Sequence, residues 1–235
     1  MRLFAIADPH LSSAQPMPMN IFGPNWEGHP EAFFEGWSSL VGRDDLVLIP
    51  GDLSWARTLE GAMPDLESIA ALPGRKVILR GNHDFWWPSI SKLRAALPDG
   101  MWAIQNDAVA INGVVIAGTR GWTCPGSYSF SAEDEKIYQR ELTRLDLSLA
   151  AASRLSGERF VVMLHYPPTN SQLEPSGFTE RLLRAAPDAV IFGHLHSGEP
   201  VQLPDLGEIA VHFVAADALG FRPKRIETCA LPLSR

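Results

Sequence analysis

Short apolar runs that each stop at a histidine, an aspartate or an asparagine constrain this chain more than any other feature of its sequence. Each run is short, apolar and bounded by glycine, proline or charge, which is typical of buried strands. In α/β proteins, ligands and catalytic groups gather at the carboxyl edge of the sheet. The sequence therefore predicts a shared site at such an edge. The five runs are residues 2–7, 45–50, 76–80, 159–164 and 188–192.

The polar residues beyond these strands repeat too consistently to be ordinary turns. A lone Asp-x-His or Gly-Asp is typical of a turn, and a lone histidine is usually a hydrogen-bonded core or surface residue. We interpret His29 and His212 in that way. Five of the seven histidines, however, lie just beyond an apolar run. The five strand ends are Asp8-Pro9-His10, Gly51-Asp52, Gly81-Asn82-His83-Asp84, His165 and Gly193-His194-Leu195-His196.

The remaining pattern predicts an α/β fold in which mixed sheets pack as a sandwich, formed by a single domain over residues 1–235. Asn112-Gly113 suits a type I′ turn in a hairpin over 108–118. Helices are expected near 33–41, over 64–72 with Pro64 in the first turn, after Pro88, over 131–155 from a capping box at Ser131, and near 180–185. Beyond residue 198 only strands and turns are expected, including strands over 209–216 and 226–231.

Composition excludes several classes of protein. The net charge of −7 and the absence of a basic run argue against a surface that binds duplex DNA. No apolar run approaches the roughly 20 residues of a membrane-spanning helix. The start lacks a secretory apolar region, so we expect a cytoplasmic protein. Cys124 and Cys229 form no CxxC pair and are expected to be small, semi-buried residues.

The donor types at the strand ends predict a centre of two metal ions. Carboxylate, imidazole and amide oxygen without thiolate suit Mn²⁺ best, with Fe and Zn²⁺ as alternatives, rather than Ca²⁺. The donors outnumber the ligands of one tetrahedral ion. A carboxylate that bridges two ions about 3.5–4 Å apart explains the excess. Glycines beside Asp52, Asn82 and His194 would let the backbone approach closely.

The ordered set of strand ends resembles the calcineurin-like metallophosphoesterases. The segments 20–26, 51–56, 118–125 and 164–170 also resemble a bacterial subgroup of predicted phosphohydrolases, so the likeness covers nearly the whole chain. The resemblance implies that His83 protonates the leaving group and that Asp84 orients its imidazole. It also implies one metal held by Asp8, His10, Asp52 and His196, and a second held by Asp52, Asn82, His165 and His194, with Asp52 bridging.

The resemblance implies hydrolysis of phosphate esters by a hydroxide that bridges the two ions. Trp55 and Ala56 stand where phosphoprotein phosphatases carry aspartate and arginine, and Asp84 replaces their glutamate. We therefore expect a phosphodiesterase acting on small or nucleotide-type diesters. A phosphomonoesterase, acting on nucleotides or proteins, is the alternative. In a different class, the chain would be a non-catalytic scaffold.

Substrate-facing residues are expected in the irregular segments, since loops at the ligand edge often carry specificity. Arg120 is the first candidate because an arginine fork suits phosphate, and Trp122 is the second. Trp86 and Trp87 are interpreted as packing residues, with a wall of the substrate cleft as the alternative. Weaker candidates are Asn20, Trp26, Arg57 and Tyr128.

Overall fold

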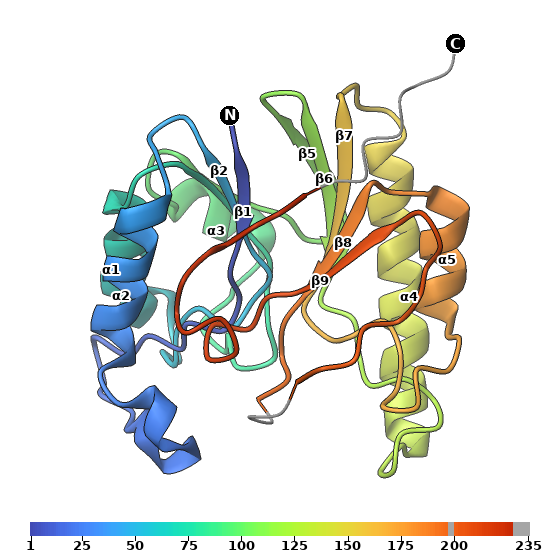
Figure 1. Ribbon diagram of the computed structural model, residues 1–235, viewed down its shortest axis with the longest axis horizontal. Helices are drawn as coiled ribbons and strands as arrows, with labels where there is room; N and C mark the ends of the chain where they lie inside the picture. Colours follow the sequence, from blue (N-terminus) through green and yellow to red (C-terminus); the bar gives the residue numbers. More distant parts are fainter. Residues whose placement is uncertain (197–199, 228–235) are drawn as a thin grey trace.

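The computed structural model describes residues 1–196 and 200–227, and it contains two five-stranded sheets packed face to face between helices (Figure 1). This confirms the predicted α/β sandwich of mixed sheets. The first sheet has the order β10-β1-β2-β3-β4, in which β1 to β4 are parallel and β10 is antiparallel. Its strands are β1 (Leu3–Ala5), β2 (Leu46–Ile49), β3 (Arg75–Ile78), β4 (Met101–Ala103) and β10 (Lys224–Arg225).

The second sheet has the order β5-β6-β7-β8-β9, with an antiparallel hairpin followed by parallel strands. At the hairpin turn Asn112 has φ 50° and Gly113 has φ 81°, as a type I′ turn requires. The predicted hairpin is therefore confirmed. The strands are β5 (Ala108–Ile111), β6 (Val114–Thr119), β7 (Arg159–Leu164), β8 (Ala189–Phe192) and β9 (Ala210–Phe213).

Helices cover the outer face of each sheet (Figure 1). Those on the first sheet are α1 (His29–Leu40), α2 (Leu59–Ala71) and α3 (Ile90–Ala96). Those on the second are α4 (Ala132–Ala152) and α5 (Gly177–Ala185), and two short 3-10 helices, η1 (Met19–Phe22) and η2 (Pro24–Trp26), precede α1. Within the described residues, no helix combines the length and apolar character needed to cross a membrane.

The strands β1, β2, β6 and β8 are buried along their whole length, and alternate side chains enter different layers of the core. In β2, Val47 and Ile49 pack with the helices that cover the first sheet. Leu46 and Leu48 pack between the two sheets, against residues such as Met163 of β7. A third layer lies between the second sheet and the helices α4 and α5. This packing holds the strand ends, and the residues beyond them, in fixed positions.

The helix predicted over 64–72 begins earlier than the sequence suggested. The Thr58 side chain accepts a hydrogen bond from the Gly61 N–H, so α2 starts at Leu59 and Pro64 lies inside the helix. An internal proline costs about 3 kcal/mol because it removes a helical hydrogen bond. Burial of Leu66 and Ile69 against the first sheet offsets that cost. The predicted position of Pro64 in the first turn was therefore wrong.

Other differences are confined to short or peripheral segments. The edge strand β4 was not predicted, because three residues are too few to show a period. Cys124 is buried as expected, whereas Cys229 lies outside the described residues. Most of the strand predicted over 226–231 also lies outside them, and the described strand β10 ends at Arg225. None of these differences changes the edge where the site forms.

Candidate metal centre

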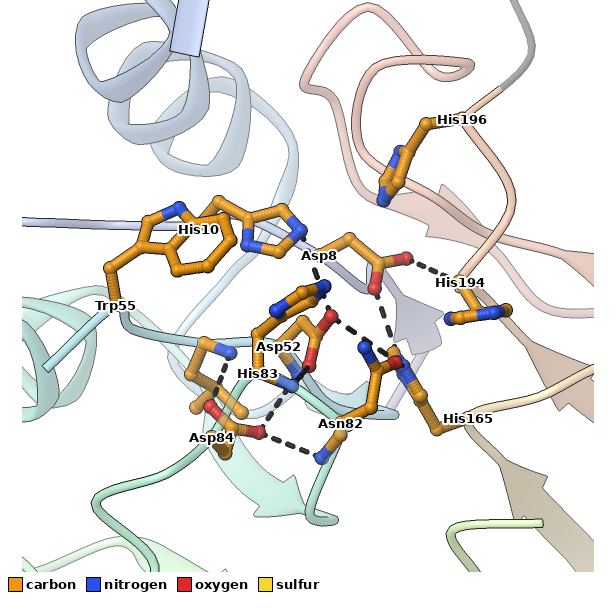
Figure 2. Close-up of polar contacts among 12 residues, drawn as sticks. Asp8, His10, Asp52, Trp55, Asn82, His83, Asp84, His165, His194 and His196 are labelled. Carbon is orange, nitrogen blue, oxygen red and sulfur yellow. Dashed lines mark hydrogen bonds and ion pairs between the residues drawn. The ribbon is translucent and has the colours of Figure 1, made fainter. Parts of the chain in front are cut away.

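The carboxyl ends of strands from both sheets meet at one edge of the sandwich (Figure 2). There the structure forms two groups of donors that share Asp8, and within each group the ligand atoms lie within 4.8 Å of one another. One group is Asp8, His10 and His196, and the other is Asp8, Asp52 and His165. Two adjacent groups of donors fit two adjacent ions.

Asp52 lies between the histidines of the two groups. Its Oδ2 is 3.7 Å from His10 Nε2 and 3.5 Å from His165 Nε2. Its Oδ1 accepts a 2.8 Å hydrogen bond from the backbone N–H of His83. One oxygen of this carboxylate therefore faces donors on both sides, which is the position a bridging ligand needs.

Asn82 and His194 complete the set beside the second sheet. The Asn82 Oδ1 lies 2.6 Å from His165 Nε2, and the other His165 nitrogen lies 2.9 Å from the Pro50 carbonyl. The His194 ring centroid is 5.0 Å from that of His165. The structure thus brings all seven predicted ligands together, although their role as ligands stays a prediction.

Two neighbours of the ligands were missed in the sequence. The Asp217 Oδ1 lies 2.9 Å from His196 Nδ1, so this carboxylate fixes the ring of a predicted ligand. The Tyr166 ring packs against His194 in a tilted arrangement, with ring centroids 3.9 Å apart. Their positions in the sequence could have indicated them as site residues. Asp217 directly follows the strand predicted over 209–216, and Tyr166 directly follows the predicted ligand His165.

The backbone at the site adopts conformations that non-glycine residues rarely take. φ is 59° at Asp8, 46° at His10, 53° at Asp52 and 72° at His194. Such residues cost about 1–3 kcal/mol each and are concentrated at functional sites. The surrounding packing must therefore hold these four residues in place.

Glycines permit the close approach of the strand ends, as the sequence predicted. A Cβ on Gly51 would lie 2.7 Å from both the Gly81 backbone and the His165 Nδ1. A Cβ on Gly81 would overlap Asp52, and one on Gly193 would overlap Asp8. Any side chain at these three positions would push the donors apart.

Burial shifts the proton affinity of the donors. It raises the pKa of Asp52 to about 6, and together with the charge of Asp52 it raises the pKa of Asp8 well above its usual range. Burial lowers the pKa of His165 to about 3 and that of His194 to about 2. The imidazoles are therefore neutral and able to donate lone pairs, while two crowded carboxylates are unfavourable without positive charge nearby.

Unpaired polar atoms show that the donor set fits divalent cations. Asp8 Oδ1 and His10 Nδ1 are buried and have no hydrogen-bond partner among the described residues. Such groups are costly to leave unsatisfied, and cations would balance the carboxylate charge. Oxygen and imidazole donors without thiolate suit Mn, Fe or Zn.

Asp84 does not contact the His83 ring, contrary to the predicted orienting role. Its carboxylate is fully buried and bonded to backbone and indole donors instead, so it joins the loops after β2 and β3. Burial and the charge of Asp52 raise its pKa to about 7. The donors are the N–H groups of Asp52, Leu53 and Gly81 and the indole N–H of Trp86, all at 2.8 to 2.9 Å.

The His83 ring lies among aromatic residues, and the backbone N–H of the same residue is bonded to Asp52 (Figure 2). Trp55 lies 4.6 Å from it, centroid to centroid, and stacks on His10 at 4.9 Å. Phe85 lies edge-on to the His83 ring, with the centroids 6.1 Å apart. The His83 Nδ1 has no hydrogen-bond partner among the described residues. Trp55, rather than Asp84, is therefore the residue that packs against the His83 ring.

Arg120 and Trp122 are both near the site, and each side chain contacts other residues of the protein. The Arg120 guanidinium lies 3.5 Å from the buried Glu141 and 4.7 Å from the Trp122 ring. Its carbonyl accepts the N–H groups of His165 and Tyr166, which anchors the end of β7. The Trp122 indole donates to Asp134 at 2.9 Å. Substrate contact by either residue stays a prediction.

The other residues singled out in the sequence are mainly packing residues. Trp26 is buried against His10 and His196, whereas Arg57 and Tyr128 are exposed. Asn20 lies exposed in η1.

Trp86 and Trp87 are buried in the core, and their indole N–H groups are hydrogen-bonded, which confirms the packing interpretation. His29 and His212 are hydrogen-bonded to carbonyl groups, as expected.

Solved structures share this fold at low sequence identity. The phosphopantetheinyl hydrolase of Mycobacterium tuberculosis superposes with a TM-score of 0.55 at 13% identity, covering 99% of this chain and 96% of that one. The Thermus thermophilus protein TT1561 superposes with a TM-score of 0.56 at 12% identity, covering 97% and 99%. At these identities the likeness concerns the fold alone.

Sequence comparison adds a relative and a family. The Gene 66 protein of Mycobacterium phage L5 is 24% identical over 191 residues, which are 81% of this chain and 75% of that protein. The model of the family described as calcineurin-like phosphoesterase matches residues 1–198, a range that includes every donor described above. The chain belongs to the calcineurin-like phosphoesterase family, whose members are metal-dependent phosphoesterases.

Proposed function

We propose that this protein is a phosphodiesterase with two metal ions, Mn²⁺ foremost, that hydrolyses small or nucleotide-type diesters. The observation that carries the dinuclear assignment is the position of Asp52, whose Oδ2 lies 3.7 Å from His10 and 3.5 Å from His165. Divalent ions bound here would supply a nucleophile from water and positive charge for the phosphoryl oxygens. We also infer a cytoplasmic location, since a chain with two cysteines and no CxxC pair suits a reducing compartment.

His83 is the proposed general acid. Its backbone N–H is fixed by Asp52, and its ring is held beside Trp55, so the imidazole has a defined place next to the donors. A positioned acid that protonates the leaving oxygen contributes typically 10²–10⁴-fold to the rate. The neutral imidazoles of His165 and His194 cannot take that part, because burial lowers the pKa of each far below neutrality.

The preference for diesters rests on the arginines near the centre. A monoester dianion brings more charge and favours additional cationic donors. The position where phosphoprotein phosphatases carry arginine is occupied by Ala56. Arg120 lies 3.5 Å from Glu141, which offsets part of its charge although Glu141 also bonds Arg144 at 2.6 Å. A diester, which carries a single negative charge, therefore fits this site better than a monoester dianion does.

The test is a panel of phosphate esters assayed with Mn²⁺. We expect kcat/KM for bis(4-nitrophenyl) phosphate to exceed that for 4-nitrophenyl phosphate by at least about tenfold, equivalent to roughly 1.4 kcal/mol of transition-state stabilisation. Faster turnover of the monoester would reject the diester assignment and favour the phosphomonoesterase. No turnover of any ester by the metal-loaded protein would favour the scaffold.

Metal analysis tests the dinuclear centre separately from the substrate. We expect about two ions per chain, and Asp52→Asn should reduce the binding of both because one carboxylate faces both groups of donors. Asp146→Asn serves as the control, because Asp146 pairs with Arg181 on the surface of the protein. Full metal content in Asp52→Asn would contradict the bridging role.

A further inference from the structure

A cavity of about 600 Å³ opens beside the candidate metal centre, on the side of the second sheet. His194 forms part of its wall, and Tyr166, which packs against His194, forms the adjacent part. The loop after β6 contributes Thr123, and the end of β8 contributes Phe192. Its volume is in the range of pockets that bind small molecules, about 300–1,000 Å³. The cavity is therefore large enough for an organic group attached to a phosphate at the centre.

The lining of the cavity has no strong charge. Among its described lining residues there is no lysine, arginine, aspartate or glutamate. Apolar side chains such as Phe192 and Val201 alternate with uncharged polar ones such as Asn170 and Gln202. The arginines near the site lie elsewhere: Arg80, Arg120 and Arg144 line a separate small cavity together with Glu141. The large cavity thus suits an uncharged group that has both apolar surface and hydrogen-bonding atoms.

The position of the cavity relative to the His83 ring determines which part of a diester the cavity would bind. The ring of His83 contacts His10, Trp55 and Phe85, all from loops that follow strands of the first sheet. In an in-line displacement the leaving oxygen lies next to the acid, and the retained alkoxy group projects to the side. His194 and the cavity belong to the second sheet, so the retained group has room there.

The geometry points to this cavity as the binding site for the retained alcohol of the diester, an uncharged group of nucleoside type. This inference rests on the proposed phosphodiesterase activity and specifies its substrate. The ring of a nucleobase would pack against Phe192 and Val201, and its polar edge would meet the amide and hydroxyl side chains of the lining. A retained group that carries a second phosphate would meet no cationic side chain among the described lining residues.

The test uses diesters that share one leaving group, 4-nitrophenolate, and differ in the retained group. Thymidine 5′-(4-nitrophenyl phosphate) is expected to have at least tenfold higher kcat/KM than methyl 4-nitrophenyl phosphate. Addition of a 3′-phosphate to the thymidine ester should remove most of that advantage. Equal kcat/KM for the methyl and thymidine esters would overturn the inference while leaving the phosphodiesterase assignment intact.

Filling the cavity provides the second arm of the test. Thr123→Trp, or Val201→Trp if the first variant does not fold, should lower the ratio of thymidine to methyl kcat/KM at least tenfold. Thr143→Trp is the control, because Thr143 is exposed on α4 and does not line the cavity. Thymidine alone should inhibit hydrolysis of the methyl ester competitively, and Thr123→Trp should weaken that inhibition. An unchanged ratio in both cavity variants would reject the site, whereas no hydrolysis of any diester would reject the proposed function itself.

Discussion

His83 and Asp84, which are adjacent in the loop after β3, make different contacts and have different roles. His83 presents its ring beside the metal centre, while Asp84 is buried and accepts N–H groups from two loops. A single buried carboxylate therefore holds the loop that carries Asp52 and the loop that carries Asn82 at a fixed separation. Because the two tasks rest on different contacts, substitutions can distinguish them.

Asp84→Ala should destabilise the protein and impair metal binding. Loss of a buried, multiply bonded carboxylate leaves several N–H groups unsatisfied and costs about 3–5 kcal/mol. For a chain of this size that corresponds to a fall in Tm of roughly 6–20 °C. Thermal unfolding and metal analysis check this. A variant with normal Tm and metal content but low kcat would instead support the orienting role that the sequence suggested.

His83→Ala should keep its metal and its Tm and lose turnover. Without the acid, the loss should be about 10²–10⁴-fold for diesters with alkoxide leaving groups and much smaller for 4-nitrophenolate, which leaves without a proton. A plot of log kcat against the pKa of the leaving alcohol measures the difference between variant and parent. Equal losses for all leaving groups would indicate a binding role.

Trp55 is expected to act through His83. Trp55→Leu removes the ring that packs against His83 and should lower kcat about tenfold with little change in KM, whereas Trp55→Phe should retain most activity. If the effect passes through His83, Trp55→Leu should cost nothing further when added to His83→Ala. Additive losses in that double-mutant cycle would mean that Trp55 acts instead through His10, on which it also stacks.

At the scale of elements, the caps of the helices fix where the loops around the site begin. The Ser131 and Asp134 side chains form a capping box at the start of α4, as the sequence predicted. Asp134 also accepts the Trp122 indole N–H at 2.9 Å. The first turn of α4 thereby holds the loop that carries Arg120 and Trp122 beside the second sheet.

Ser131→Ala tests the contribution of this cap. Loss of an N-cap hydroxyl costs about 1 kcal/mol, which lowers Tm by roughly 2–4 °C in a protein of this size. Ser129→Ala, at an exposed position just before the helix, is the matched control and should change stability by less than about 0.5 kcal/mol. Equal Tm values for the two variants would show that the capping box contributes little to stability.

At the scale of the whole molecule, the donors of the centre come from both sheets, so bound metal would stabilise the fold. Asp8, His10 and Asp52 follow strands of the first sheet, whereas His165 and His194 follow strands of the second. Ions held between them would bind the folded chain only. A ligand at a hundred times its Kd stabilises the fold by about 2.7 kcal/mol per site.

Chelation should lower Tm, and readdition of Mn²⁺ should restore it by roughly 5–10 °C per site at saturating concentration.

The increase in Tm that Mn²⁺ causes should become larger as pH rises. In the metal-free protein the pKa of Asp52 is raised to about 6, so its contribution to stability is present below about pH 4 and is lost as pH rises through 6. Since metal binds the ionised carboxylate, the gain from Mn²⁺ should be larger at pH 7.5 than at pH 5. A gain that fell with rising pH would contradict this account.

The sequence by itself was sufficient for the features that depend on local chemistry. The apolar runs, the Asn112-Gly113 turn and the capping box at Ser131 act over a few residues, so their patterns could be read directly. The ordered donors from Asp8 to His196 could be recognised for the same reason, since each lies shortly after one of five apolar strands. Family and fold followed from these signals.

Only the tertiary structure decided which groups touch one another across the sheets. Nothing near Asp84 in the sequence shows that its carboxylate bonds to the loop after β2, or that Trp55 takes the place beside His83. The proline inside α2 is tolerated because distant residues pack around that helix. The cavity beside His194 is enclosed by loops far apart in the chain. These contacts join residues separated by many positions, and their energies depend on packing that no local pattern records.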